Sequence, residues 1–169
     1  LYGESLTSEF KYRRLSLRLR VKIPNISSLT IANIFFVDNE GLLQANEKEI
    51  LQDLLCASEG LRKHKPEDIL FLVVPRLGTI SPWASKATDI AHNCGLQRVR
   101  RIERAIAHQV SFALEPSARE KELIADLIHD QMTETVLHSV DHGTALFDQK
   151  SPVNLTHVDV LTGGVSALV

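Results

Sequence analysis

Residues 97–115, QRVRRIERAIAHQVSFALE, alternate between apolar and polar side chains with a period of two. Successive side chains of a β-strand point to opposite faces, so this stretch predicts one long strand or the edge of a bent hairpin. A strand of this length needs neighbours for its backbone hydrogen bonds, and the chain therefore has to build a sheet. The apolar face carries Ile102, Ile106, Val110, Phe112 and Leu114, and the polar face carries Arg101, Glu103, Gln109 and Ser111.

Three further segments have strand character. Residues 28–38, SLTIANIFFVD, are rich in β-branched and aromatic residues and stop at the turn DNEG. Residues 69–75, ILFLVVP, form the longest apolar run, which predicts a buried strand. Residues 156–161, THVDVL, are expected to form a last strand.

Capping signals predict two amphipathic helices. Asn46 is expected to cap the first, with Glu49 as its capping-box partner. Ser117 is expected to cap the second in the box SARE, and such a cap stabilises a helix by about 1 kcal/mol. The first apolar stripe consists of Ile50, Leu51, Leu54 and Leu55, and the second of Leu123, Ile124, Leu127, Ile128 and Met132.

The first 23 residues allow two interpretations. Residues 15–23, LSLRLRVKI, alternate apolar and basic side chains, and this periodicity favours a half-buried strand. Leu6, Phe10, Leu17 and Val21 also fit one face of a helix. The following proline ends the element in either case.

Strands and helices mix without a strict β-α-β rhythm, which predicts the α+β class with an open sheet covered by helices. A length of 169 residues suits one domain, or two small lobes with a shared core. The formal net charge of -2 and the pI near 6.4 argue against a dedicated nucleic-acid or membrane-surface binder. No apolar run approaches the roughly 18 residues that a membrane span needs.

Cysteine usage and the chain ends add two expectations. Cys56 and Cys94 lie far apart and outside any CxxC spacing, so they are predicted to be free thiols in a reducing cytosol. The chain begins LYGES without a methionine and ends LTGGVSALV, and both ends indicate a piece of a longer protein.

Residues 75–95, PRLGTISPWASKATDIAHNCG, connect the buried strand to a short helix. Ser81 is the expected N-cap, and Pro82 the first helical residue, where a missing N–H costs no hydrogen bond. The helix is expected to stop near Gly95, because glycine adopts the backbone conformation that ends helices.

The start of this helix is a candidate anion site. Its first backbone N–H groups would point out beside Arg76, Ser85 and Lys86, an arrangement that suits a phosphate or a carboxylate. The alternative is a plain structural cap, in which Trp83 packs on the sheet and Lys86 is solvated.

Two basic clusters are expected to be charged surfaces or interfaces. Nucleic-acid binding is disfavoured for the first, because its arginines have no interleaved aromatic residues and alternate between the two faces of a strand. This cluster consists of Arg98, Arg100, Arg101 and Arg104. The second lies near the N-terminus, where anion binding is the alternative to a solvated or interface face. It consists of Lys11, Arg13, Arg14, Arg18, Arg20 and Lys22.

The sequence predicts neither a metal site nor a catalytic constellation. His138 and His142 offer two of the three or four ligands that zinc usually takes, and a helix end is the favoured interpretation. His92 and Cys94 could pair as base and thiol nucleophile, but residues two apart on a helix point in different directions.

Residues 75–105, PRLGTISPWASKATDIAHNCGLQRVRRIERA, resemble the N-terminal domain of bacterial phosphoribosylformylglycinamidine synthase, the large single-chain enzyme of purine biosynthesis. The core GTISPWASKATDIAHNCGL and the following RIER are long and unusual, so the resemblance is specific. Weaker similarity at LVVPR, ETV and VDVL extends it over most of the chain.

The resemblance implies an α+β fold with helices packed on a largely antiparallel open sheet. It also implies two pseudo-symmetric halves, because the family's domain resembles a dimer of a small separate subunit. In place of the strand that periodicity favours, it implies a helix over Ser5–Val21. The implied domain spans residues 1–152 with halves of about 1–75 and 76–152, and residues 153–169 would begin a linker towards the synthetase domain.

The family's enzyme converts formylglycinamide ribonucleotide, glutamine and ATP to formylglycinamidine ribonucleotide, glutamate, ADP and phosphate. The chain would be a non-catalytic part of this ATP-dependent glutamine amidotransferase, a cytoplasmic ligase. ATP and Mg belong to the full enzyme, and no cofactor is expected in this chain. Its partners would be the synthetase and glutaminase domains of the same chain and the ribonucleotide substrate, with no nucleic acid and no membrane.

The resemblance also implies that residues 76–86, the motif loop, face the synthetase active site and the ammonia passage. No catalytic residue is expected, and Cys94 is not the glutaminase nucleophile. The residues expected beside the substrate or at an interface are Arg76, Thr79, Ser81, Pro82, Trp83, Ser85 and Lys86. Two alternatives stay open: a purely structural docking domain, and a free-standing anion- or RNA-binding module.

Overall fold

A computed structural model describes residues 1–4, 7–60, 68–148 and 157–168 of the chain. Its central feature is a six-stranded sheet in the order β3-β1-β2-β5-β4-β6, in which every neighbouring pair is antiparallel. The expected α+β fold with an antiparallel open sheet is therefore confirmed. The elements are β1 (Tyr2–Gly3), α1 (Glu9–Lys22), β2 (Ile26–Asn39), α2 (Ala45–Leu55), β3 (Ala57–Ser58), β4 (Ile69–Pro75), α3 (Pro82–Asn93), β5 (Val99–Phe112), α4 (Ala118–Ile128), β6 (Glu134–Leu137), η1 (Val140–Phe147), α5 (Val160–Gly163) and η2 (Gly164–Leu168).

The order β-α-β-α-β occurs twice, from β1 to β3 and from β4 to β6. Strands β2 and β5 begin at residues 26 and 99 and end at 39 and 112, while α2 and α4 begin at 45 and 118 and end at 55 and 128, a constant separation of 73 residues. Asn33 and Ile106 are partners in the β2–β5 ladder and are also 73 residues apart, so the pseudo-twofold axis passes through this pair. In this repeat the second half begins with β4. The expected halves, about 1–75 and 76–152, instead put β4 at the end of the first half.

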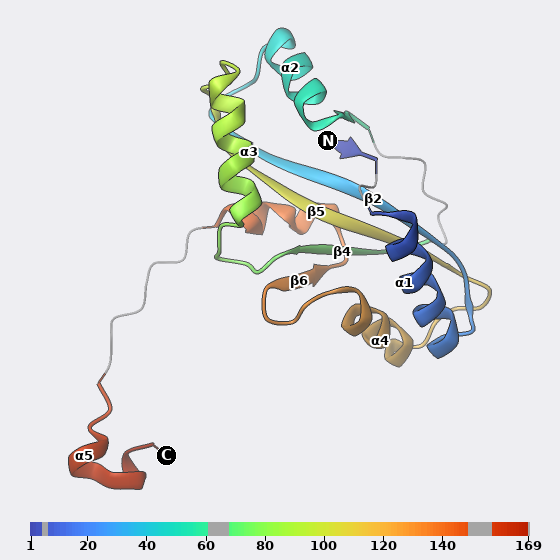
Figure 1. Cartoon of the computed structure of the whole chain (residues 1–169), viewed down its shortest axis with the longest axis vertical. Helices are drawn as coiled ribbons and strands as arrows, with labels where there is room; N and C mark the ends of the chain where they lie inside the picture. The colour runs from blue at the N-terminus through green and yellow to red at the C-terminus, as the bar shows by residue number, and fades with distance from the viewer. Residues whose placement is uncertain (5–6, 61–67, 149–156, 169) are drawn as a thin grey trace.

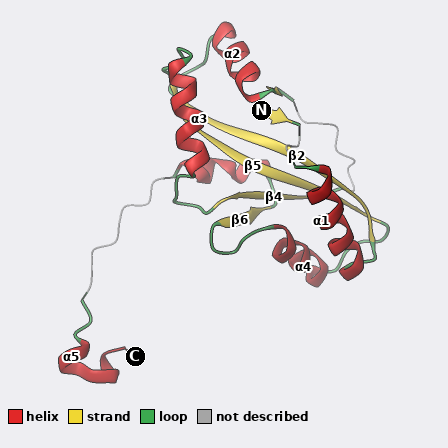
Figure 2. Ribbon diagram, viewed as in Figure 1, coloured by secondary structure: helices red, strands yellow, loops and turns green. Residues whose placement is uncertain are grey.

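Helices α1 to α4 all lie on one face of the sheet, with α1 and α4 towards one end and α2 and α3 towards the other (Figures 1 and 2). Even-numbered side chains of β5 point to this face. Val110 packs in a cluster with Leu19 of α1 and Ile124 of α4. Ile102 packs with Leu51 of α2 in the cluster that α3 shares.

The opposite face of the sheet is covered by η1. Its Leu146 is buried against Leu72 of β4 and Ala105 of β5. Gly143 lies directly on the ring of Phe36, because a Cβ at residue 143 would stand 2.0 Å from Cε1 of that ring. The backbone of η1 can come this close to β2 only with glycine at this position.

Residues 15–23 do not form the strand that periodicity favoured. They lie in α1, where the resemblance implied a helix, and the cap Ser8 accepts a hydrogen bond from the N–H three residues later. Leu19 is fully buried, whereas Leu17 is 65% exposed. Only one stripe of α1 contacts the sheet, so the remaining alternation of apolar and basic side chains faces solvent.

The strands predicted over residues 28–38, 69–75 and 97–115 are confirmed as β2, β4 and β5. The helix after Ser117 is confirmed as α4, with its capping box in place. The cap expected at Asn46 is wrong by two residues: α2 begins after Gln44, whose backbone N–H donates to Glu47 Oε2 at 2.7 Å.

Two further expectations are corrected. Met132 does not extend the buried stripe of α4, because the backbone becomes extended at His129 and Met132 is 79% exposed. The strand expected over residues 156–161 is not formed in its described part, where Asp159 caps the short helix α5 by accepting from the Thr162 N–H. Residue 156 itself lies outside the described residues.

No helix in the described ranges is both long enough and apolar enough to cross a membrane.

Candidate functional site

The loop between β4 and α3 is held in a defined conformation. The Thr79 N–H and Oγ1 both donate to the Arg76 carbonyl, at 3.1 and 2.6 Å. The Arg76 N–H donates to the Thr133 carbonyl at 2.9 Å, which joins the loop to the segment before β6. Backbone hydrogen bonds therefore position the side chains of this loop.

The start of α3 has the structure that the sequence predicted. Ser81 Oγ accepts from the Ala84 N–H at 3.0 Å, and Pro82 is the first helical residue. The helix ends before Gly95, which has a φ of 90°. Serine cap, proline and glycine thus fix both ends of α3.

The carboxylate of a neighbouring strand lies at the N-terminal end of α3. Glu103 of β5 is fully buried, and its Oε2 accepts from Ser81 Oγ at 2.9 Å, while its Oε1 accepts from the Ser81 N–H at 3.4 Å. An anion at this position is stabilised by the positive end of the helix dipole. A carboxylate of the chain itself therefore binds the cap residue of α3.

Arg101 completes this buried network. Its Nε and one terminal nitrogen donate to Glu103 Oε1 at 3.0 and 2.6 Å, and the same terminal nitrogen donates to the Thr79 carbonyl at 2.9 Å. Its guanidinium also lies 5.4 Å from the ring centroid of Phe147. Arg101 thus connects β5, the motif loop and η1.

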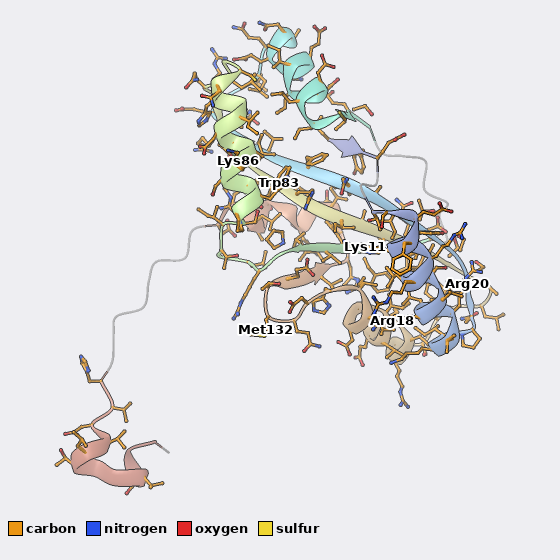
Figure 3. The ribbon with its side chains drawn as sticks, viewed as in Figure 1. Lys11, Arg18, Arg20, Trp83, Lys86 and Met132 are labelled. Atoms are coloured by element: carbon orange, nitrogen blue, oxygen red, sulfur yellow. The ribbon has the colours of Figure 1, made fainter. Side chains whose placement is uncertain are left out.

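Beside this network lies a cleft of about 470 Å³, a size typical of small-molecule sites. It lies between the start of α3, the end of β4 and the segment before β6. Two of its lining residues, Trp83 and Met132, are labelled in Figure 3. The lining residues are Val73, Val74, Pro75, Arg76, Thr79, Ile80, Ser81, Pro82, Trp83, Arg104, Ile106, Met132, Thr133 and Glu134.

Trp83 forms one wall of the cleft and is held between two partners. Its ring stacks on Phe35 of β2, with centroids 5.7 Å apart and planes 26° apart. The guanidinium of Arg104 lies 5.1 Å from the Trp83 ring centroid, within the range of a cation–π interaction. These contacts show Trp83 packed on the sheet, as the alternative of a plain structural cap predicted.

Two guanidinium groups and one carboxylate line the cleft. Arg76 is exposed, and its side chain makes one long hydrogen bond, 3.5 Å to the Met132 carbonyl. Glu134 Oε2 accepts from the Asp130 N–H at 2.9 Å. Two positive charges against one negative give this cleft a net positive charge.

The structure brings together five of the seven residues expected at the site and places two elsewhere. Arg76, Thr79, Ser81, Pro82 and Trp83 all line the cleft. Lys86 instead lines a hollow of about 220 Å³ between α2 and α3, one turn further along the helix (Figure 3). Ser85 is exposed and lines neither of these cavities.

The basic clusters do not form one surface. Lys11, Arg18 and Arg20 lie on α1, at the other end of the sheet from Trp83 (Figure 3). On β5, Arg100 pairs with Asp38 at 2.8 Å. The arginines of β5 differ in their partners, as the predicted alternation between faces requires.

Other chemical candidates are occupied by structural contacts. A ring nitrogen of His92 lies 2.6 Å from the Val99 carbonyl, and Cys94 is an exposed free thiol at the end of α3. His138 follows β6 and packs edge-on against Phe71, so the helix end expected there is wrong. Across the described ranges, no group of three or more His, Cys, Asp or Glu side chains could hold a metal ion.

Glu103 and Arg104 belong to the site although they are not among the residues that the sequence predicts there. Glu103 was assigned to a charged strand face, yet it is fully buried beneath the loop. Arg104 has the even-numbered parity of the apolar face, where Ile102 and Ile106 flank it. An arginine among apolar residues of one parity was the sequence signal that could have identified it.

A comparison with protein families gives a match. The family described as formylglycinamide ribonucleotide amidotransferase N-terminal matches residues 32–147, well over half of the chain. The matched span begins within β2 and ends with η1. It contains all of the residues that line the cleft, as well as the buried Arg101–Glu103 pair.

Proposed function

Because the chain belongs to the family of formylglycinamide ribonucleotide amidotransferase N-terminal domains, and so to an amidotransferase enzyme of purine biosynthesis, we propose that it is the non-catalytic domain that shapes this enzyme's active site and ammonia passage. The observation that carries the proposal is the motif loop. It is the most distinctive stretch of the sequence, and five of its side chains line a cleft: Arg76, Thr79, Ser81, Pro82 and Trp83.

A structural role for the domain fits the chemistry of the cleft. Its polar groups can bind or orient a ligand, but its described residues include no nucleophile paired with a base. The bond-making residues, ATP and Mg would belong to the synthetase domain, and glutamine would be hydrolysed in the glutaminase domain. A cytoplasmic location follows from this assignment.

The loop residues have different roles in this proposal. Arg76 and Thr79 face the cleft and would close the substrate or ammonia region, while Trp83 anchors the loop through Phe35. Ser81 acts through Glu103, which fixes the start of α3. Lys86 and Ser85 would contribute only where a neighbouring domain covers the outer side of α3.

Kinetics of the intact enzyme test the proposal. We expect Arg76→Ala to lower the glutamine-dependent and the ammonia-dependent rates about tenfold or more, because a charged group beside the substrate is lost. Arg14→Ala is the matched control, since it removes an exposed arginine from α1, far from the cleft. Wild-type rates of Arg76→Ala with both nitrogen donors would refute a role in the active site.

The docking alternative predicts a different result for the same variant. If the loop is only an interface, Arg76→Ala would weaken the association of this domain with the synthetase domain. The rates of the assembled enzyme would then stay at the wild-type level. Measuring domain association and turnover in parallel therefore separates the two functions.

A further inference from the structure

The outer side of α1 carries a row of large apolar side chains in solvent. Phe10, Leu17 and Val21 are 73%, 65% and 79% exposed, although the same helix buries Leu19 completely. Their spacing of seven and four residues places all three in one row, because an α-helix turns once every 3.6 residues. A group of exposed apolar side chains with polar neighbours is typical of a surface that binds another molecule.

Cations flank this apolar row on both sides. Lys11, Arg18 and Lys22 each follow one of its members by one position, so they form a parallel cationic row. In the part of the chain that the structure describes, these three side chains have no hydrogen bond or ion pair. Arg13 and Arg20 flank the other side, and both are already held by hydrogen bonds within the chain. The cationic row is therefore free to pair with carboxylates of another molecule.

The positive charge is a property of this helix and not of its place in the fold. Helix α1 contains six lysines and arginines and one glutamate, a net charge of +5, whereas the whole chain has a formal net charge of -2. In the internal repeat α3 corresponds to α1, because their caps Ser8 and Ser81 are also 73 residues apart. Helix α3 has one lysine and one aspartate. A helix in this position therefore does not have to be basic.

We propose that the outer face of α1 docks an acidic amphipathic helix of a protein partner. The apolar row would form the seam, since spacings of four and seven residues are those along which two helices pack knobs into holes. The cationic row would lie at the margin of the seam, where charged residues of two packed helices pair. Carboxylates of the partner would supply the opposite charge and fix its orientation on α1.

The composition of this face disfavours other anionic occupants. A helix that lies on a lipid surface uses a wide apolar face, whereas the apolar row is one side chain wide between basic residues. Single-stranded RNA binds to aromatic side chains on which its bases stack. Helix α1 has two aromatic residues, and one of them, Tyr12, is half-buried and donates to the Leu29 carbonyl at 2.9 Å. An acidic helix would use the apolar row and the cationic row together.

A model peptide tests this face directly. Its heptads carry leucine at positions a and d and glutamate at e and g, so that it can form an amphipathic helix while charge repulsion opposes pairing with itself. We expect it to bind the chain saturably in a calorimetric titration, with an affinity that falls as the salt concentration is raised. The same peptide with lysine in place of glutamate should not bind.

Variants of exposed residues locate the binding site without disturbing the core. Leu17→Gln should weaken binding of the acidic peptide about tenfold or more, because it removes an apolar contact from the centre of the seam. Arg18→Gln should weaken binding severalfold and reduce its salt dependence. Leu42→Gln and Arg119→Gln are the matched controls, since these residues are also exposed and lie outside α1.

The inference is overturned if the acidic peptide does not bind, or if Leu17→Gln binds it as tightly as the wild type does. Binding of phosphatidylserine vesicles or polyuridine RNA without binding of the acidic peptide would assign the face to a lipid or a nucleic acid instead. Dimerisation of the chain that Leu17→Gln prevents would assign it to a second copy. Helix α1 lies at the other end of the sheet from Trp83 (Figure 3), so none of these results bears on the proposed function of the cleft.

Discussion

Replacing the buried carboxylate beneath the motif loop should destabilise the domain far more than breaking a similar pair at the surface. Glu103→Gln keeps the size of the side chain and removes its charge. In the wild type Glu103 accepts hydrogen bonds from Ser81 and Arg101, and its side chain is 0% exposed. The NH₂ group of the glutamine is a donor and cannot accept the hydrogen bonds that Ser81 and Arg101 donate to the wild-type carboxylate.

The expected magnitude follows from this burial. Breaking a buried ion pair by removing one partner costs about 3–5 kcal/mol, since the other charge is left without compensation. For a chain of this size, 1 kcal/mol shifts the melting temperature by about 2–4 °C, so Glu103→Gln should lower it by at least about 6 °C.

The chain offers a matched control on the same strand. Arg100 and Asp38 also form an arginine–carboxylate pair, at 2.8 Å, but their side chains are 62% and 27% exposed. Solvent screening makes such pairs contribute little, so Asp38→Asn should leave the melting temperature nearly unchanged. Calorimetry on both variants decides the matter: equal shifts for Glu103→Gln and Asp38→Asn would show that the buried network does not hold the loop.

Two further predictions concern stability. Gly143→Ala should cost about 1–3 kcal/mol or more of unfolding free energy through its clash with Phe36, and adding Phe36→Leu should restore part of the loss in urea unfolding. Burial lowers the pKa of His108 to about 4 from 6.5, so the folded state resists protonation. The unfolding free energy should then fall by up to about 3 kcal/mol as the pH drops from 6.5 to 4, and His108→Leu should remove that component.

Local patterns predicted the elements that local interactions determine. The long alternation of β5, the capping box at Ser117 and the Ser81 cap each depend on residues close in sequence, and all three are confirmed. The strand favoured over residues 15–23 was wrong because alternation of apolar and basic side chains does not show which of them contact the sheet. In α1 that choice is made by tertiary packing, which buries Leu19 and leaves Leu17 in solvent.

The site was harder to predict because its chemistry joins distant segments. Glu103 is 22 residues from Ser81, and its burial depends on how the loop folds over β5. In the first half, Thr30 stands where the second half has Glu103, and Ser28 stands where it has Arg101. The first half therefore forms its strands and helices without an Arg–Glu pair at these positions, whereas the second half contains one. The shared scaffold thus does not dictate this pair, which is specific to the second half, where it holds Ser81 and Thr79 in place.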